Sequence, residues 1–289
     1  MKITHRIHIF YFSGTGNTWW CTKKIEERLI ATGNEVSCSS IEQVTRAEVE
    51  RIIAAVDIIG IGYPIYGSDL PEPMKIFIDE VLPETDSVRI RLFTFCTQLI
   101  YSGDGGYVYK KELKAKGWPI FSAVHLIMPN NISVTVFPIS STNDRKKIDK
   151  KLLRAEKKIA RFTKRLFSAT PKRQGHTLGS FMLGIIQRGP FRLGYKRLQN
   201  DITIDHDKCT RCMRCVKICS AGNLLDIDEK ITAQGNCMLC LRCYNYCPVQ
   251  AIVYYKRPHI ESRGIPYRGP VPEFRPEMIC KKDSKELPG

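Results

Sequence analysis

The chain has 289 residues, of which 43% are hydrophobic, so it is long enough for two domains with cores of ordinary size. No apolar run approaches the roughly 20 residues that cross a bilayer, and residues 1–10 lack the apolar stretch and cleavage site of a secretory signal. We therefore expect no transmembrane segment and a cytoplasmic location. The formal charge of +16 is concentrated in residues 144–200, which hold 17 Lys and Arg against 3 Asp and Glu.

The first predicted strand, residues 6–12, is apolar and rich in β-branched and aromatic residues, and a loop of small and hydroxyl-bearing residues follows it. This loop comprises Ser13, Gly14, Thr15, Gly16, Asn17 and Thr18. A predicted helix continues through residue 31, so free N–H groups and the helix dipole favour an anion such as phosphate at the loop. The loop has no lysine and does not read G-x-G-x-x-G, which excludes a Walker loop and a nicotinamide site. An ordinary tight turn is the alternative.

Four further strands are predicted, and helical segments separate them. The strands are residues 35–39, 57–62, 89–96 and 120–128, and the helices lie near residues 45–54, 71–82 and 106–116. This alternation predicts an α/β domain in which helices cover both faces of a parallel five-stranded sheet. Ligands of such sheets bind at the carboxyl ends of the strands.

Two loops at later strand ends have the chemistry to hold a planar ring with a polar edge. Residues 62–67 include Tyr63 and Tyr66, and residues 97–106 are rich in glycine and polar groups. An isoalloxazine ring suits both loops, because a side chain can pack on its face while backbone groups bind its pyrimidine edge. Simple packing of the tyrosines and a helix-entry turn at the glycines are the alternatives.

Residues 5 to about 165 resemble a flavodoxin in the phosphate-type loop and in the two later loops. The resemblance implies a doubly wound, flavodoxin-like fold that binds FMN. It also implies that residues 13–18 contact the phosphate. The implied contacts of the flavin ring are Tyr63, Pro64, Tyr66, Gly67, Thr97, Gly103, Asp104 and Gly105.

The basic region begins with a predicted amphipathic helix, in which apolar residues recur every three or four positions. These residues are Ile148, Leu152, Ala155, Ile159, Phe162 and Leu166. The positive charge of residues 144–200 predicts that an acidic partner docks there. A merely solvated helix face and an anionic membrane surface are the alternatives. No nucleic-acid-binding signature accompanies the charges, so nucleic acid is not expected as a partner.

Glycine, proline, lysine and arginine dominate residues 168–200 and predict a basic linker, whose apolar piece at residues 181–186 packs on one domain or contacts a partner. Six prolines in residues 257–289 predict a C-terminal tail without regular structure, which lies extended over the surface or is loose. We do not expect its His259 and Cys280 to be ligands. The predicted domains are therefore residues 1–167 and 201–256.

Eight cysteines form two identical C-x-x-C-x-x-C-x-x-x-C sets, 28 residues apart. Three thiolates of one tight loop can hold three corners of a cubane, and in the two-cluster pattern the fourth cysteine of each set binds the other cluster. The spacing therefore predicts two 4Fe-4S clusters. One would be held by Cys209, Cys212, Cys215 and Cys247, and the other by Cys219, Cys237, Cys240 and Cys243. Zinc sites and a disulfide framework are the alternatives.

Residues 201–256 resemble the bacterial two-cluster ferredoxins, including the Cys247-Pro248 step, and the resemblance implies a small α+β domain. Ser220 departs from that pattern, because the first set would usually carry proline there. The order of the two parts resembles the EFR-type ferredoxin-domain proteins of anaerobes over nearly the whole chain. Four further cysteines have no mutual spacing pattern and are interpreted as structural thiols; they are Cys21, Cys38, Cys96 and Cys280.

These features predict an electron-transfer iron–sulfur flavoprotein that relays electrons between two 4Fe-4S clusters and FMN, and that meets a redox partner protein at its basic region. FMN passes one or two electrons and each cluster passes one, so the fusion can couple the two kinds of step. The alternative is an enzyme in which FMN reduces a quinone, nitro compound or enone. No catalytic side-chain constellation is recognised, and the sequence does not indicate an oligomeric state.

Overall fold

The computed structural model of the protein describes residues 4–86, 89–132, 144–257, 259 and 265–281. Five strands form one sheet in the order β2-β1-β3-β4-β5, and every pair is parallel. The strands are β1 (Arg6–Tyr11), β2 (Glu35–Ser40), β3 (Ile58–Pro64), β4 (Arg91–Gln98) and β5 (Ile120–Ile127). The predicted flavodoxin-like sheet is therefore confirmed, with its switch point between β1 and β3.

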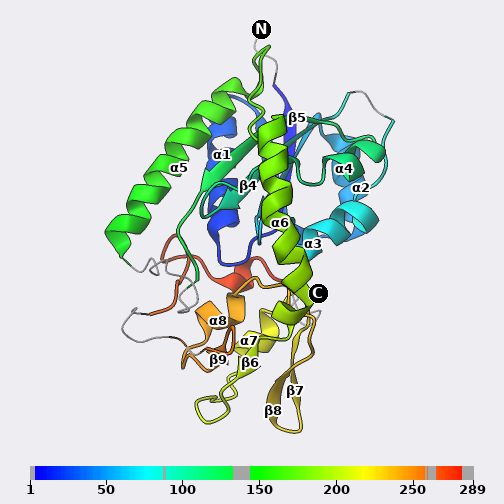
Figure 1. Cartoon of the computed structure of the whole chain (residues 1–289). Helices are drawn as coiled ribbons and strands as arrows, with labels where there is room; N and C mark the ends of the chain where they lie inside the picture. The colour runs from blue at the N-terminus through cyan, green and yellow to red at the C-terminus, as the bar shows by residue number, and fades with distance from the viewer. Residues whose placement is uncertain (1–3, 87–88, 133–143, 258, 260–264, 282–289) are drawn as a thin grey trace, which may run out of the picture.

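Helices cover both faces of this sheet (Figure 1). On one face, α1 (Asn17–Ile30) and α5 (Arg145–Leu166) pack on Ile7 and Ile9. On the other face, α2 (Arg46–Ala55) and α3 (Glu72–Ile76) pack with Phe10 and Phe12. A π-helical turn (Phe77–Val81) extends α3, and α4 (Lys110–Ala115) follows the short 3-10 helix Gly105–Tyr107. The apolar stripe predicted for α5 is confirmed, because all six of its members are buried.

A long helix, α6 (Leu178–Gln199), occupies most of the region that the sequence predicted as a linker. It begins where the Thr177 hydroxyl accepts a hydrogen bond from the Ser180 N–H at 3.2 Å, and it continues through Pro190. Glycine and proline disfavour a helix interior, so packing against the rest of the chain must stabilise α6. It runs in front of the sheet and reaches toward the C-terminal part (Figure 1).

The C-terminal part is small and contains two antiparallel strand pairs, β6 (Thr203–Ile204) with β9 (Ile252–Val253) and β7 (Leu224–Ile227) with β8 (Lys230–Ala233). Its short helices are α7 (Arg214–Lys217) and α8 (Arg242–Tyr246). Together these elements enclose a separate apolar core. Among the described residues, no helix is long and apolar enough to span a membrane.

The described residues of the C-terminal tail pack against the sheet domain rather than lying loosely on the surface. Phe274 and Ile279 are fully buried in a cluster that includes Tyr11 of β1. The Ser40 hydroxyl donates to the carbonyl oxygen of Ile279 at 2.7 Å. As predicted from the prolines, regular structure is sparse among the described tail residues, where the 3-10 turn Pro276–Met278 is assigned. Apolar side chains between the prolines anchor the segment.

Candidate functional site

A cavity of about 350 Å³ lies where the loops at the carboxyl ends of β1, β3, β4 and β5 meet the C-terminal part. Its size falls within the range of about 300–1,000 Å³ that is usual for ligand pockets. Nine of the sequence-predicted site residues line it: Ser13, Gly14, Thr15, Asn17, Thr18, Pro64, Tyr66, Gly67 and Thr97. The fold therefore brings the predicted phosphate loop and both predicted ring loops to one place.

The loop of residues 13–18 has the geometry of an anion site. Gly16 adopts a φ of 97°, which side-chain-bearing residues rarely adopt, and the first turn of α1 has no side-chain cap. The Trp19 N–H donates to the Ser13 hydroxyl at 3.2 Å, and the N–H groups that precede it at this helix start face the loop where an anion would bind. Thr15 and Thr18 are held by neighbouring loops, since the Thr15 hydroxyl accepts from the Asn131 amide at 3.0 Å and the hydroxyls of Thr18 and Thr97 are 2.8 Å apart.

Tyr66 carries an unpaired polar atom into the cavity wall. Its hydroxyl is buried and has no hydrogen-bond partner among the described residues, and burial raises its pKa well above the usual value. The hydroxyl packs against Gly14, where a Cβ would clash with it and would also lie 2.8 Å from the carbonyl oxygen of Cys240. Such a buried orphan donor is rare unless a ligand completes it, so the cavity wall fits a polar ligand.

Four of the predicted ring contacts do not line the cavity. Tyr63 is buried and donates to the carbonyl oxygen of Gly105 at 3.0 Å. Gly103 packs against the backbone of α6. Asp104 forms a buried ion pair with Arg188 of α6, with Nη2 and Oδ2 3.0 Å apart. Gly103 and Asp104 lie apart from the cavity because α6, which the sequence did not predict, packs on their loop. Tyr63 and Gly105 instead bond each other.

The cavity is also lined by residues that the sequence did not predict as site residues. Some come from the loop after β5, which carries Asn130 and Asn131, and its position at a strand end was a usable signal. Others come from α6 and from the C-terminal part: Phe191, Leu239, Leu241, Tyr254 and Tyr255. These apolar and aromatic side chains lie more than a hundred residues from the phosphate loop in sequence, so strand-end reasoning could not find them.

The eight cysteines gather as the two predicted sets. A small cavity is lined by Cys209, Cys212, Cys215 and Cys247. Burial, and after it the electrostatic effect of the neighbouring Cys247, Cys209 and Cys212, raises the pKa of Cys215 to about 11. In the other set, burial and then Cys240, Cys237 and Cys219 raise the pKa of Cys243. Thiols with such pKa values become thiolates when a cation binds them.

The backbone around the cysteines has the same local conformation at equivalent positions of the two sets. Met213 and Leu241 occupy equivalent positions, and both have a φ of 61°. Backbone N–H groups donate to sulfur from Asn223 to Cys219 and from Ala251 to Cys247, each at 3.2 Å. Among the described residues, no three His, Cys, Asp or Glu side chains converge as a single metal ion needs. The spacing of the thiols on two tight loops is what suits a cluster in which each ligand binds a different iron.

Two protein-family models match the chain. A flavodoxin domain matches residues 8–131, and a 4Fe-4S binding domain matches residues 202–224. The chain joins a flavodoxin domain to a 4Fe-4S binding domain. The flavodoxin domain implies FMN, and the 4Fe-4S domain implies an iron–sulfur cluster. The protein is thus an electron-transfer protein of the flavin and iron–sulfur type, and the cavity and the cysteine sets described above fit these groups.

Solved structures similar to the chain include several flavodoxins. A flavodoxin from the domain Archaea is 17% identical with a TM-score of 0.35, and the match covers 55% of this chain and 99% of that one. For Megasphaera elsdenii flavodoxin the identity is 24%, the TM-score 0.36 and the coverage 44% and 90%. For a putative quinone reductase from Klebsiella pneumoniae the values are 11%, 0.41, 60% and 90%. No curated protein matches the chain.

Proposed function

We propose that the protein relays electrons between two 4Fe-4S clusters and FMN, with residues 1–167 as the flavin domain and residues 201–256 as the cluster domain. FMN supplies one- and two-electron chemistry when bound, and each cluster supplies one-electron chemistry. The observation that carries the proposal is the composition of the 350 Å³ cavity, which the phosphate loop and the second cysteine loop line together. A flavin held there would lie beside the residues proposed to hold a cluster.

The residues of the cavity have separate roles in this proposal. The loop of residues 13–18 would bind the phosphate through the N-terminus of α1. The ring would be held by Pro64, Tyr66, Gly67 and Thr97, which line the same cavity. Leu239, Leu241 and Tyr254 would exclude water from the side that faces the clusters. One set of ligands would be Cys209, Cys212, Cys215 and Cys247, and the other Cys219, Cys237, Cys240 and Cys243.

An anaerobic redox titration tests the relay. Purified, reconstituted protein is expected to contain one FMN and the iron and sulfide of two clusters. Visible and EPR spectroscopy follow the reduction of each group during the titration. After rapid mixing with a one-electron donor, cluster reduction should precede flavin reduction within the same molecule. Cluster reduction without transfer to bound flavin would refute the relay. Steady-state turnover of a quinone, nitro compound or enone would support the alternative reductase function.

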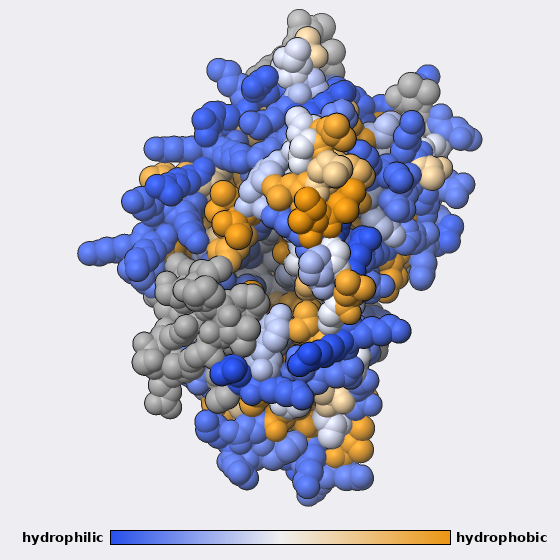
Figure 2. Space-filling view, viewed as in Figure 1, coloured by the Kyte–Doolittle hydropathy of each residue, from blue (hydrophilic) through white to orange (hydrophobic). Residues whose placement is uncertain are grey.

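The outer face of α5 is the proposed docking site for an acidic redox partner. Its exposed cations include Lys146, Lys150, Arg154, Lys157, Arg161 and Lys164. Hydrophilic residues dominate this side of the molecule, whereas apolar side chains gather over α6 (Figure 2). Like-signed charges on one face raise the local concentration of an oppositely charged partner and speed its association.

Charge reversal on α5 should slow electron delivery. The triple variant K150E/R154E/K157E is expected to lower the second-order rate with an acidic ferredoxin about tenfold at low salt, and high salt should remove the difference. Stopped-flow spectroscopy at several ionic strengths measures both effects. The matched control is R51E/K111E/K114E, which makes the same charge change at exposed positions on α2 and α4, across the sheet. Equal rates for the two triple variants would argue against docking on α5.

A further inference from the structure

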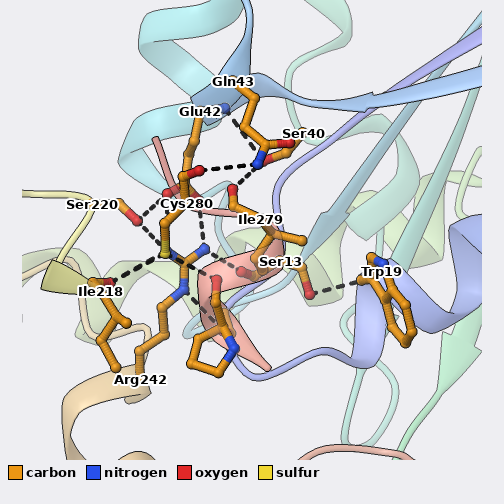
Figure 3. Close-up of polar contacts among 12 residues, drawn as sticks. Ser13, Trp19, Ser40, Glu42, Gln43, Ile218, Ser220, Arg242, Ile279 and Cys280 are labelled. Carbon is orange, nitrogen blue, oxygen red and sulfur yellow. Dashed lines mark hydrogen bonds and ion pairs between the residues drawn. The ribbon is translucent and has the colours of Figure 1, made fainter. Parts of the chain in front are cut away.

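Arg242 is a fully buried arginine at the junction of the two domains (Figure 3). It stands between the second and third cysteines of the second set, next to Cys243. Its Nε donates to the carbonyl oxygen of Gly14 at 3.0 Å, and its Nη2 donates to that of Ser13 at 2.5 Å. A side chain of the cluster loop therefore binds the backbone of the phosphate loop directly.

The charge of Arg242 is matched by groups from three parts of the chain. Glu42, which follows β2, is 8% exposed and accepts from Nη1 of Arg242 at 2.9 Å. Ser220 hydrogen-bonds both Arg242 and Glu42, and the Cys280 sulfur accepts from Arg242 at 3.2 Å. A buried guanidinium needs such complete pairing. The arginine is thus fixed in one position rather than able to swing between partners.

This contact sets the direction of two N–H groups at the ligand site. The described peptide bonds are all trans, and in a planar trans peptide the C=O and the N–H point in opposite directions. The carbonyls of Ser13 and Gly14 point at Arg242, so the N–H groups of Gly14 and Thr15 point away from it. Both residues line the cavity. Arg242 therefore orients donors of the phosphate loop from behind.

We propose that Arg242 is a positioning residue that couples FMN binding to assembly of the second cluster. The inference rests on the proposed placement of FMN in the cavity and of a cluster on Cys219, Cys237, Cys240 and Cys243. The cluster fixes the loop that carries Cys240 and Cys243, the loop fixes Arg242, and Arg242 fixes the phosphate loop. Such coupling is reciprocal, so bound FMN also stabilises the second cluster against loss.

The repeat supplies a matched control. Arg214 lies 28 residues before Arg242, at the equivalent position of the first set. It pairs with Glu277, with Nε and Oε1 2.8 Å apart, and both side chains are partly exposed. Among the described residues, its hydrogen-bond and ion-pair partners do not include the phosphate loop. A substitution of Arg214 therefore removes an arginine from the equivalent position of a cysteine loop but leaves the contact between Arg242 and the phosphate loop unchanged.

The experiment measures FMN affinity by flavin fluorescence quenching under anaerobic conditions, before and after chelation removes the clusters. For the wild type, cluster removal should weaken FMN binding about tenfold, within the usual range of about 5- to 150-fold for coupled sites. R242M should bind FMN as weakly with its clusters as without them. R242K should recover part of the affinity, because the lysine ammonium keeps the positive charge but lacks the several N–H donors of the planar guanidinium. R214M should behave as the wild type does.

A second readout follows the cluster. FMN should slow chelation of the second cluster in the wild type and in R214M but not in R242M. Wild-type FMN affinity in R242M, or no effect of cluster removal on the wild type, would overturn the coupling. If R242M does not fold by circular dichroism, R242K decides: its FMN affinity should depend less on the clusters than that of the wild type, and a wild-type dependence would overturn the coupling. Failure of the relay leaves these affinities unchanged, whereas a wild type that binds no FMN would overturn both proposals.

Discussion

Replacing Asp104 with alanine is expected to lower the free energy of unfolding by about 3–5 kcal/mol, the usual cost of leaving a buried charge unpaired. Asp104 and Arg188 have side chains that are 2% and 8% exposed, and their second contact, from Nη2 to Oδ2, is 3.0 Å long. Without the carboxylate, the guanidinium keeps the carbonyl oxygen of Ser68, 3.1 Å from Nη1. One neutral acceptor cannot compensate a buried cation.

The double variant D104L/R188M distinguishes the cost of leaving Arg188 unpaired from the net contribution of the ion pair to the free energy of unfolding. Apolar replacement of both members of a buried pair is often neutral, so this variant should regain most of the stability that D104A loses. Guanidinium unfolding followed by circular dichroism under nitrogen measures both. A loss below about 1 kcal/mol in D104A would show that water reaches Arg188 and that α6 is less firmly packed than its contacts indicate.

Stability should also fall in mild acid because a buried histidine must become charged. His125 is completely buried, and its Nε2 accepts from the Gly106 N–H at 2.9 Å. Burial, and after it the charge of Lys158, lowers the pKa of His125 to about 4. The unfolded chain, with a histidine pKa of about 6.5, binds the proton first. The stabilisation is therefore complete above pH 6.5 and is lost as the pH falls to 4, by about 3 kcal/mol in total.

The variant H125Q isolates this contribution from that of the carboxylates. Glutamine offers an oxygen to the Gly106 N–H but does not titrate, so its unfolding free energy should change less between pH 6.5 and 4 than that of the wild type. H206Q, at an exposed position, is the control and should keep the wild-type slope. Equal slopes for H125Q and the wild type would mean that the histidine is not held neutral in the folded protein.

Periodic and local patterns predicted most of the fold. The five strands and α5 follow from side-chain patterns that the buried core requires, and the cysteine sets follow from fixed spacing. Helix α6 was not predicted, because its glycines and Pro190 are poor helix formers and only tertiary contacts stabilise it. At Gly184 a side chain would clash with Asp104, so the glycine that weakens the helix prediction is what lets the helix pack.

That one missing element explains the difference at the candidate site. The loop of residues 103–105 has the composition of a ligand loop, but α6 covers it and Arg188 takes the carboxylate of Asp104. The cavity wall instead includes Leu239 and Leu241 from the cysteine loop. Contacts between residues so distant in sequence leave no local pattern. Ser220 was a visible departure from the ferredoxin pattern, and its hydrogen bonds to Arg242 and Glu42 give that departure a structural meaning.

The two cysteine sets have the same spacing but are buried to different depths. Cys212 is exposed to solvent, whereas Cys237, Cys240 and Cys243 are buried. Oxygen, peroxide and chelators diffusing in from solution therefore meet the outer copy of the repeat first, and the inner copy is shielded behind it. Oxidative loss of the clusters should consequently proceed in two stages. The cluster bound mainly by the first cysteine set should be lost before the cluster beside the cavity.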